Sequence, residues 1–383
     1  MTAREMAIVG GGPVGLSAAL AAAHHGVDVV VLEVQEDSGT SDPRVFALSY
    51  ATRLILEQLG AWAYLPAAHP IRTVHVSERG AFGAATLKAD MLGLPALGYV
   101  IAQPDLMQAL RRRIHDIGIE RVVGARVTEV GERSSEALVR YERNGEQHDL
   151  TAASVALAEG GATHAVGSPL LERDYRQHAL AATIEAQYAA GDWAYERFTP
   201  NGPIALLPVA RAHALVWTVP SADADRLLAL EDDAFERAVS ECYGSRIGAV
   251  RLRGPRASFA LKLRFAHQVP GTRIVLIGNS AQTLHPVAGQ GFNLGLRDAY
   301  ELAAILGACV RAAQSPVQGL RRYRSERRLD RAGGMLFTDS LVRAFSNDNP
   351  LIACARSAAL AALDAIEPAK RFVMRRMIFG APR

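Results

Sequence analysis

A glycine pattern between two apolar segments constrains the fold of this 383-residue chain more than any other feature. The stretch EMAIVGGGPVGLSAALAAAHHGVDVVVLE contains Gly10, Gly12 and Gly15 in the spacing G-x-G-x-x-G. It reads as a buried strand, a tight turn, a helix that ends at Gly26, and a second buried strand that ends at Glu33. This order predicts a parallel βαβ unit that binds a dinucleotide.

Each residue of the pattern has a physical role in such a unit. Gly10 permits the turn, Gly12 lets the backbone approach a pyrophosphate, and Gly15 lets the helix pack closely on the strand. The helix N-terminus offers unpaired N–H groups and a positive dipole end to the phosphates. Glu33 can accept hydrogen bonds from ribose hydroxyls, and its charge argues against a 2′-phosphate there. The alternative is a βαβ turn without a nucleotide, and the acid at this distance argues against it.

The composition indicates a globular protein without a metal site or a nucleic-acid partner. Hydrophobic residues make up 49% of the chain and charged residues 21%, so packed cores can form. The three cysteines form no CxxC pair, which argues against a disulfide framework or a zinc site and suits a reducing cytoplasm. The net charge of +3 is too small to indicate nucleic-acid binding.

Neither a signal peptide nor a membrane-spanning helix is expected. Residues 6–32 are apolar, but the glycine turn falls where the apolar region of a signal peptide would lie. Arg356 and Asp364 interrupt the most apolar C-terminal stretch. We therefore expect a cytoplasmic protein.

The middle of the chain alternates between two kinds of segment. Helices are expected at 47–60 and 103–118, a hairpin with its turn at Asn144-Gly145, and a buried strand at 154–167. Residues 71–101 and 176–265 read as an antiparallel sheet, with one helix at 232–243. This interleaving predicts an α/β, Rossmann-like nucleotide domain and an antiparallel-sheet domain, which make the whole chain α+β. Both domains are discontinuous, and a helical C-terminal tail follows them. The expected domains are 1–70, 102–167 and 266–315 for the nucleotide, 71–101 and 168–265 for the substrate, and 316–383 for the tail.

A second glycine-rich segment, GNSAQTLHPVAGQGFNLGLRD, runs from Gly278 to Asp298. It follows the apolar stretch TRIVLI, an expected strand, and leads into an expected helix at 292–311. Asn279 stands where a nucleotide-binding turn often carries an acid. An asparagine can both accept and donate hydrogen bonds without placing a negative charge near a pyrophosphate.

Together these segments resemble the single-component flavoprotein aromatic hydroxylases, which have the p-hydroxybenzoate hydroxylase fold. Within that fold the 278–298 segment is similar to the ubiquinone-biosynthesis branch, which includes the 2-polyprenyl-6-methoxyphenol hydroxylases. The stretches YERFTPNGPIALLP (195–208) and FTDSLVRAF (337–345) also resemble this branch. The resemblance covers essentially the whole chain, and the 278–298 segment is its most specific part.

The resemblance implies a monooxygenase with tightly bound FAD. NADPH or NADH would reduce the flavin without a second Rossmann domain. O2 would then form a flavin C4a-hydroperoxide, which transfers OH to the ring of a polyprenyl phenol while the antiparallel domain excludes water. Two alternatives remain open: another FAD-dependent enzyme of this fold, such as a reductase or a halogenase, and a flavin-binding scaffold without turnover.

The resemblance also implies roles for individual residues. Arg44 matches a family arginine that contacts FAD. Glu159 replaces the aspartate of the family's Ala-Asp-Gly turn, which is linked to the binding of both FAD and the reduced nicotinamide. The helix after Gly291 would direct its first N–H groups at the flavin edge that becomes negative on reduction. The predicted FAD-binding residues are Gly10, Gly12, Pro13, Val14, Gly15, Glu33, Arg44, Gln103, Glu159, Gly278, Asn279, Pro286, Gly289, Gly291, Phe292 and Asn293.

No residue identifies itself as the catalytic base. The candidates are His285, which either faces the ligand or is structural, Pro286 beside the expected ring position, and Asn293. Asn293 either starts the helix by hydrogen bonding or lines the active site. The expected substrate sheet carries three further side chains that are equally consistent with packing: Tyr195, His213 and Trp217.

Basic charge is concentrated near the C-terminus. Residues 321–331 carry a net charge of +4 and residues 370–383 a net charge of +5. The 370–383 segment either packs on the protein, including in a homodimer, or anchors it peripherally to an anionic inner membrane. A ubiquinone-biosynthesis complex is a further expected partner, as the resemblance implies.

Overall fold

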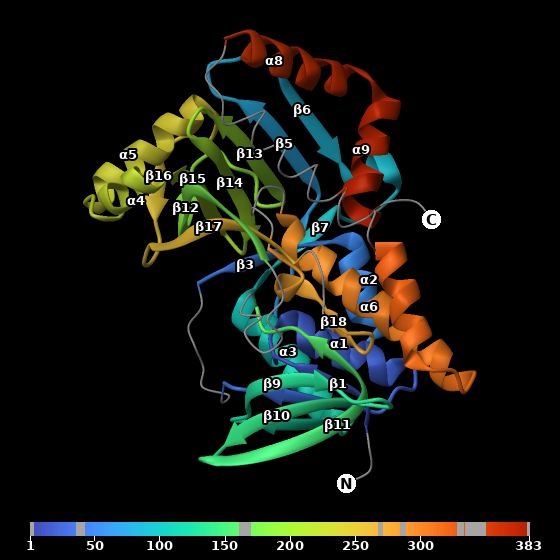
Figure 1. Ribbon diagram of the computed structural model, residues 1–383. Helices are drawn as coiled ribbons and strands as arrows, with labels where there is room; N and C mark the ends of the chain where they lie inside the picture. Colours follow the sequence, from blue (N-terminus) through green and yellow to red (C-terminus); the bar gives the residue numbers. More distant parts are fainter. Residues whose placement is uncertain are drawn as a thin grey trace.

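The computed structural model describes residues 4–35, 43–160, 170–266, 271–283, 289–327, 333 and 350–380. Two large sheets lie at opposite ends of the molecule, with helices between and around them (Figure 1). The described chain begins with β1 in the first sheet and ends with helix α9, near the second (Figure 1). The mixed α/β architecture and the C-terminal helices confirm the predicted fold class.

The first sheet has seven strands and contains the predicted βαβ unit. Its order is β8-β2-β1-β11-β10-β9, and β18 pairs with β11. The pairs β1–β2, β1–β11, β2–β8 and β11–β18 are parallel, whereas β9, β10 and β11 pair in antiparallel fashion. The strands are β1 (Arg4–Val9), β2 (Val29–Glu33), β8 (Glu120–Val123), β9 (Arg126–Glu132), β10 (Ala137–Arg143), β11 (Glu146–Leu157) and β18 (Ile274–Leu276).

Both faces of the parallel strands are buried, as their continuous apolar sequences require. On one face, Met6 and Ile8 of β1 join a core to which three helices, among other elements, contribute. On the other face, Ala7 and Val9 pack with apolar residues of β9 and β10. The three helices are α1 (Pro13–His24), α3 (Gln103–Asp116) and α6 (Gln290–Arg311).

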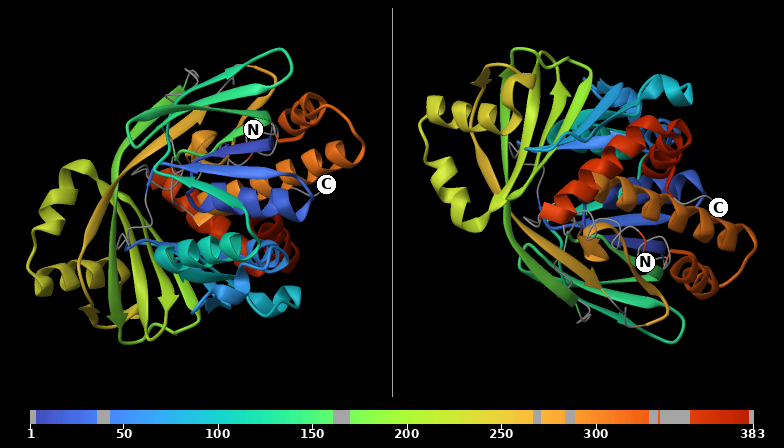
Figure 2. Two further views of the ribbon diagram at one scale, coloured as in Figure 1. Left: turned by 90° about the horizontal axis from the view of Figure 1, so that it is seen from below. Right: turned by 90° about the horizontal axis from the view of Figure 1, so that it is seen from above.

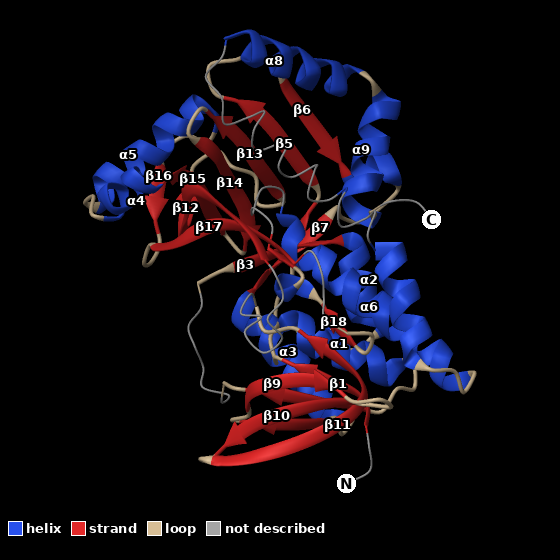
Figure 3. Cartoon of the chain, viewed as in Figure 1, coloured by secondary structure: helices blue, strands red, loops and turns tan. Residues whose placement is uncertain are grey.

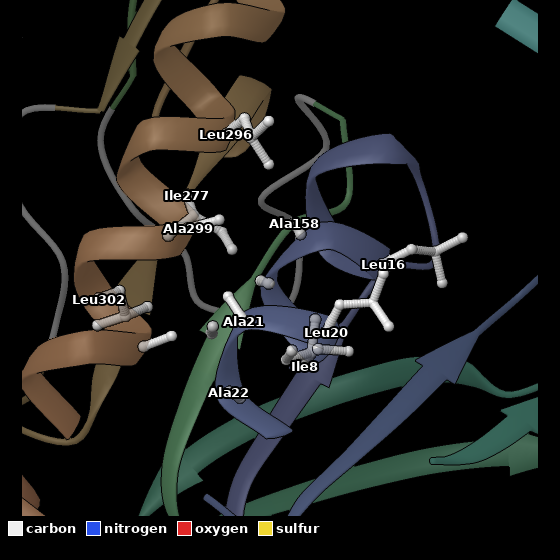
Figure 4. Close-up of a cluster of buried hydrophobic side chains, with 14 of the residues drawn as sticks. Ile8, Leu16, Leu20, Ala21, Ala22, Ala158, Ile277, Leu296, Ala299 and Leu302 are labelled. Carbon is white, nitrogen blue, oxygen red and sulfur yellow. The ribbon is translucent and has the colours of Figure 1, made fainter. Parts of the chain in front are cut away.

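Helices α1 and α6 run side by side in the same direction. A Cβ at Gly295 would lie 2.8 Å from Val14 near the start of α1, and a Cβ at Gly307 would lie 2.6 Å from the His25 carbonyl oxygen at its end. Figure 4 shows the small residues of α1 facing the leucine and alanine side chains of α6. Because the helices are parallel, their N-termini lie at the same end of the molecule.

The second sheet has nine strands and carries helices on one face. Its order is β19-β17-β12-β15-β14-β13-β5-β6, and β16 pairs with β12. Helices α4 (Ser221–Leu228) and α5 (Asp232–Tyr243) cover the outer face, which points away from the rest of the molecule (Figure 2). The strands are β5 (Thr73–Glu78), β6 (Ala84–Lys88), β12 (Leu170–Ala186), β13 (Trp193–Thr199), β14 (Gly202–Val209), β15 (Ala212–Pro220), β16 (Val250–Leu252), β17 (Ala257–Ala266) and β19 (Gln282–Thr283).

A small third sheet stands between the two large ones. It has the order β3-β7-β4, with β3 (Val45–Ser49), β4 (His69–Ile71) and β7 (Gly98–Ala102). Helix α2 (Tyr50–Gln58) follows β3 directly, and the Ser49 hydroxyl caps it by accepting a hydrogen bond from the Thr52 N–H at 3.2 Å. The sheet joins segments that the sequence assigned to different domains, and those domain boundaries stay a prediction.

Two C-terminal helices lie against the second sheet. Figure 3 shows α8 (Pro350–Ala365) crossing the ends of β5 and β6, and α9 (Glu367–Phe379) descending from it. The Ser357 hydroxyl accepts a hydrogen bond from the Gly83 N–H at 2.6 Å. Within the described part of the chain, no helix combines the length and apolarity needed to cross a membrane.

The predicted elements differ from the structure in a few places. The helix expected at 47–60 begins only at Tyr50, because residues 45–49 pair with β7 as a strand. The expected helix at 232–243 is α5, but α4 was not foreseen. The turn at Asn144-Gly145 is confirmed, since both residues have positive φ, 54° and 81°.

Candidate active site

One cavity of about 1280 Å3 joins the glycine turn to the inner face of the nine-stranded sheet. Ligand pockets commonly occupy about 300–1,000 Å3, so this cavity has room for a dinucleotide and a second ligand. Its polar end is lined by Gly10, Gly11, Gly12, Pro13, Val14, Glu33, Arg44, Gln103, Arg111, Arg126, Thr128 and Glu159. Its middle is lined by residues 45–49 and by Asn279, Gly289, Gly291, Phe292 and Asn293.

The glycine turn has the geometry that the sequence predicted. Gly10 has φ +107°, a conformation that favours glycine. A Cβ at Gly15 would lie 1.9 Å from the Gly10 carbonyl oxygen, so only glycine allows α1 to approach β1 this closely. A Cβ at Gly12 would meet no atom within 4 Å. The space beside Gly12 is therefore open to the cavity, as a bound pyrophosphate requires.

Glu33 is held by two arginines that the sequence did not single out. Glu33 is 4% exposed, and its carboxylate accepts hydrogen bonds from Arg111, at 3.3 Å, and Arg121, at 2.7 Å. Arg111 lies eight residues after Gln103 on α3, and both line the cavity. This spacing of about two helical turns was a signal that could have identified Arg111. Gly11 was also missed: a Cβ there would lie 2.3 Å from the Glu33 carboxyl carbon.

Asn293 is a structural residue at the start of α6. It is 2% exposed, and its Oδ1 accepts from the Ser49 N–H at 2.8 Å and from the Thr52 hydroxyl at 2.7 Å. Its Nδ2 donates to the carbonyl oxygens of Ala47 and Gly289, both at 2.9 Å. These four bonds use the whole hydrogen-bonding capacity of the side chain. Of its two predicted roles, the structure thus shows the helix-start role, although the residue also borders the cavity.

The other predicted residues divide into lining and packing positions. Arg44 lines the cavity with its guanidinium 5.3 Å from the centre of the Phe259 ring. Gly278, with φ +56°, does not line the cavity, and a Cβ there would lie 3.0 Å from Val14. Gly15 likewise serves packing rather than lining. His285 and Pro286 lie outside the described residues.

The inner face of the nine-stranded sheet forms the apolar end of the cavity. Strand alternation places Ala194, Glu196 and Phe198 of β13 in the lining. The remaining lining residues of this end include Val74, Val76, Leu87, Pro203, Ala205, Leu207, Val216, Thr218, Leu360, Leu363, Val373, Met374, Met377 and Ile378.

Three side chains of the nine-stranded sheet that could either contact substrate or serve packing lie on its outer face. Tyr195 and Trp217 pack in the outer core with α4 and α5. His213 shares their face, and its Nε2 lies 3.2 Å from the carbonyl oxygen of Ala190. Of the two roles left open by the sequence, contact with substrate and packing within the sheet, the structure places these residues in packing positions. Glu196, the neighbour of Tyr195, was missed because sequence alternation does not say which face borders a cavity.

Glu159 introduces an acid at the junction of the glycine turn and β11. It lines the cavity, and its Oε2 is buried without a hydrogen-bond partner among the described residues. Burial raises the pKa of the Glu159 carboxyl to about 7. The group can therefore be neutral or charged near physiological pH, unlike an ordinary glutamate.

A family model described as an FAD binding domain matches residues 4–335. The chain belongs to this FAD-binding family.

Relatives named as hydroxylases match nearly the whole chain. The ubiquinone hydroxylase UbiL of Rhodospirillum rubrum is 33% identical, over 97% of this chain and 88% of its own. The 3-demethoxyubiquinol 3-hydroxylase of Escherichia coli is 31% identical, over 96% of each chain. Among solved structures, p-nitrophenol 4-monooxygenase PnpA of Pseudomonas putida aligns with a TM-score of 0.78 at 18% identity, over 100% of this chain and 99% of that one. This last likeness shows the fold.

The cavity can hold FAD on structural grounds as well. The open space at Gly12 and the N-terminus of α1 offer N–H groups and a positive dipole end to phosphates, and the N-terminus of α6 offers a second positive dipole end to the same cavity. A Cβ at Gly291 would also meet no atom within 4 Å, so the start of α6 is open to a ligand. Among the described residues no cluster of side chains could hold a metal ion. The protein is an FAD-dependent enzyme.

The pKa of Glu159 predicts a pH-dependent stability for the FAD-free protein. The raised pKa means that the folded state binds more protons than the unfolded state between about pH 4.5 and 7. The stability that the protonated acid provides is present below pH 4.5 and lost as the pH rises through 7. Glu159→Gln should match the wild type near pH 4.5 and exceed it at pH 8 by about 1–3 kcal/mol.

Urea unfolding of both proteins across this pH range measures the effect. Glu185→Gln is the matched control, because Arg253 lowers the pKa of that exposed acid and its loss should bring no gain at pH 8. An unchanged difference between Glu159→Gln and wild type at both pH values would contradict the burial of the acid.

Proposed function

We propose that this protein is an FAD-dependent monooxygenase that hydroxylates the ring of a polyprenylated phenol in ubiquinone biosynthesis. The observation that carries the proposal is the single cavity that runs from an FAD-type glycine turn to an apolar sheet face and on to two C-terminal helices. The named activities of the two curated relatives agree with it.

The residues of the polar end would bind FAD. The backbone at Gly12 and the start of α1 would hold the pyrophosphate, and Glu33 would accept hydrogen bonds from the ribose. Arg111 and Arg121 fix the orientation of the Glu33 carboxylate for that role. When bound, FAD supplies the chemistry: it takes electrons from NADPH or NADH and delivers one oxygen atom of O2 to the ring.

The start of α6 would stabilise negative charge on the reduced flavin. Asn293 fixes this helix end by joining it to β3 and α2 through three hydrogen bonds, and a fourth bond reaches the carbonyl oxygen of Gly289 at the cap of α6. A positioned helix N-terminus favours a nearby anion by roughly 0.3–2 kcal/mol. Asn279 borders the same region without adding a negative charge.

The apolar end would bind the phenol and its polyprenyl chain. The sheet face excludes water from the ring, which protects reactive groups from side reactions. Leu360, Leu363, Val373, Met374 and Met377 extend the apolar wall onto α8 and α9. Methionine and leucine side chains suit a flexible hydrocarbon chain, because they adapt to its shape.

A flavin spectrum of the purified protein tests this function. We expect a yellow protein whose flavin is bleached by NADPH or NADH, and faster when a short-chain 2-prenyl-6-methoxyphenol is present. Colour without nicotinamide-driven bleaching would indicate a flavin-binding scaffold instead. Glu159 stands where the resembled family has an aspartate linked to nicotinamide use, so the test must ask whether a nicotinamide reduces the flavin. Failure to take up FAD would contradict both accounts.

We further propose that the outer face of α9 contacts an anionic membrane. Phe372, Arg375, Arg376 and Phe379 are all exposed and follow the i, i+3, i+4, i+7 spacing of one helix face. Phe372 is 69% exposed and Phe379 is 44% exposed, although large aromatic side chains are usually more buried. Aromatic and basic residues together on one face are typical of helices that lie on anionic bilayers. Such a position would bring the cavity wall close to a lipid-borne substrate.

Vesicle co-sedimentation tests the membrane contact. The quadruple variant Phe372→Ser/Arg375→Glu/Arg376→Glu/Phe379→Ser should bind anionic vesicles at least ~10-fold more weakly, since each surface arginine contributes about 1 kcal/mol. Point substitutions are better than removing 370–383, because the inner face of α9 forms part of the cavity. Arg211→Glu/Arg237→Glu, at exposed positions elsewhere, is the control for charge. Equal losses in both variants would refute a specific α9 contact. A homodimer and a ubiquinone-biosynthesis complex stay predictions.

A further inference from the structure

The inner face of the nine-stranded sheet contains an acid that the proposed function has not used. Glu196 lies on β13 between Ala194 and Phe198, and all three line the cavity. Among the described residues of this sheet that line the cavity, it is the one ionisable side chain. The neighbouring Arg197 belongs to the opposite face, where it donates a hydrogen bond to the Ser77 hydroxyl at 3.2 Å.

The surroundings of Glu196 are apolar in every direction within the sheet. Its register partners are Ala205 on β14 and Val76 on β5. Val216 follows beyond Ala205. In the described part of the chain, no side chain or backbone group forms a hydrogen bond or an ion pair with the Glu196 carboxyl. A polar group in such a place is destabilising unless something satisfies it.

Other titratable groups near Glu196 do not neutralise it. Tyr243 of α5 lies on the outer side of the sheet, and its hydroxyl donates a hydrogen bond to the Ile204 carbonyl oxygen at 2.9 Å. The lining residues of β5, β14, β15, α8 and α9 carry no charged side chain. Burial raises the pKa of Glu196 to about 7. A ligand is therefore the natural partner for this carboxyl.

We propose that Glu196 binds the ring hydroxyl of the phenol and acts as the base that accepts its proton. The inference rests on the proposed function. The phenolic O–H bond breaks, the proton forms a bond to a carboxylate oxygen of Glu196, and the electron pair stays on the phenolic oxygen. The resulting phenolate is more electron-rich at its ortho and para carbons, which are the positions that accept an electrophilic oxygen atom.

The acidity of the two groups suits this transfer. A phenol has a pKa of about 10, and an ordinary glutamate a pKa of about 4.3, so the proton transfer would be unfavourable by nearly six pKa units. With the Glu196 pKa at about 7, the gap narrows to roughly three. A base of this strength is still deprotonated in a large fraction of molecules at neutral pH, as general base catalysis requires.

The experiment compares Glu196→Gln with the wild-type holoenzyme on a short-chain 2-prenyl-6-methoxyphenol. The glutamine has the same shape but cannot accept the proton, so kcat for ring hydroxylation should fall about 100-fold or more. In wild type, kcat/KM should rise with pH through about 7, and this rise should be absent in Glu196→Gln. Glu196→Asp should keep that rise, because it retains a base. Glu185→Gln, at a position on β12 of the same sheet where the side chain is 43% exposed, should leave both quantities unchanged.

A binding measurement separates hydroxyl recognition from a structural role. Wild type should bind the phenol more tightly than its methyl ether, in which the hydroxyl is replaced by methoxy, and Glu196→Gln should lose this preference. FAD content and thermal unfolding should show that the variant is folded. Wild-type kcat and an unchanged pH profile in Glu196→Gln would overturn the inference about Glu196 and leave the proposed function intact. If wild type itself hydroxylates no phenol, the proposed function fails and the inference fails with it.

Discussion

Gly12→Ala is expected to give a folded protein that has lost most of its affinity for FAD. Gly12 has φ −72°, which alanine adopts freely, and the added Cβ meets no protein atom within 4 Å. That Cβ would instead occupy the space proposed for the pyrophosphate. Overpacking of this kind commonly costs about 1–3 kcal/mol, so the Kd for FAD should rise roughly 10- to 100-fold. Titration of the FAD-free protein with FAD, followed by flavin fluorescence, measures it.

Two comparison variants show whether the effect of Gly12→Ala is specific. Gly131→Ala, in β9 and away from the cavity, also adds a Cβ with no atom within 4 Å and should leave FAD binding unchanged. Gly15→Ala should behave differently from Gly12→Ala and lose stability, because its Cβ collides with the Gly10 carbonyl oxygen. Wild-type FAD affinity in Gly12→Ala would show that the pyrophosphate does not lie at this turn.

Arg356→Met should weaken the attachment of the C-terminal helices by about 3–5 kcal/mol. Arg356 of α8 is 8% exposed and donates from its Nε to Glu78 Oε1 of β5 at 2.9 Å, and its Nη2 also contacts that oxygen. The substitution leaves the Glu78 carboxylate buried without a described partner, and this is more destabilising than the pair itself is stabilising. Since α8 and α9 form one wall of the cavity, hydroxylation should fall as well.

Hydrogen exchange in α8 and urea unfolding measure this effect. The double variant Glu78→Leu/Arg356→Met should recover most of the lost stability, because it removes both charges together. Glu185→Gln, which breaks the exposed pair with Arg253, should cause no measurable loss. Equal protection of α8 in wild type and Arg356→Met would show that the buried pair does not hold the helix.

The sequence predicted the local features of the dinucleotide site because those features follow from backbone sterics. Gly10 and Gly15 are required by a positive φ and by a close backbone approach, and both requirements are visible in the spacing alone. The expected helix after Gly291 follows in the same way from the end of the glycine-rich segment. The structure adds that α1 and α6 are parallel, so that two helix N-termini serve one cavity.

The lining of the apolar end of the cavity could not be predicted from the sequence as fully as the dinucleotide site. Alternation along β13 shows that Glu196 and Phe198 share a face and that Tyr195 points the other way. Which face borders the cavity depends on α4 and α5, which cover the outer side and come from a later part of the chain. The apolar wall on α8 and α9 is likewise a long-range contact. Its contacts with the sheet include the buried pair of Arg356 with Glu78, and these residues are far apart in the sequence.

Incorporation of labelled oxygen tests the central claim most directly. The holoenzyme is supplied with NADPH, 18O2 and a short-chain 2-prenyl-6-methoxyphenol, and the product is analysed by mass spectrometry. The account predicts one 18O atom in the ring for each NADPH consumed in coupled turnover. NADPH consumption that yields only hydrogen peroxide, or a ring oxygen that comes from water, would contradict it.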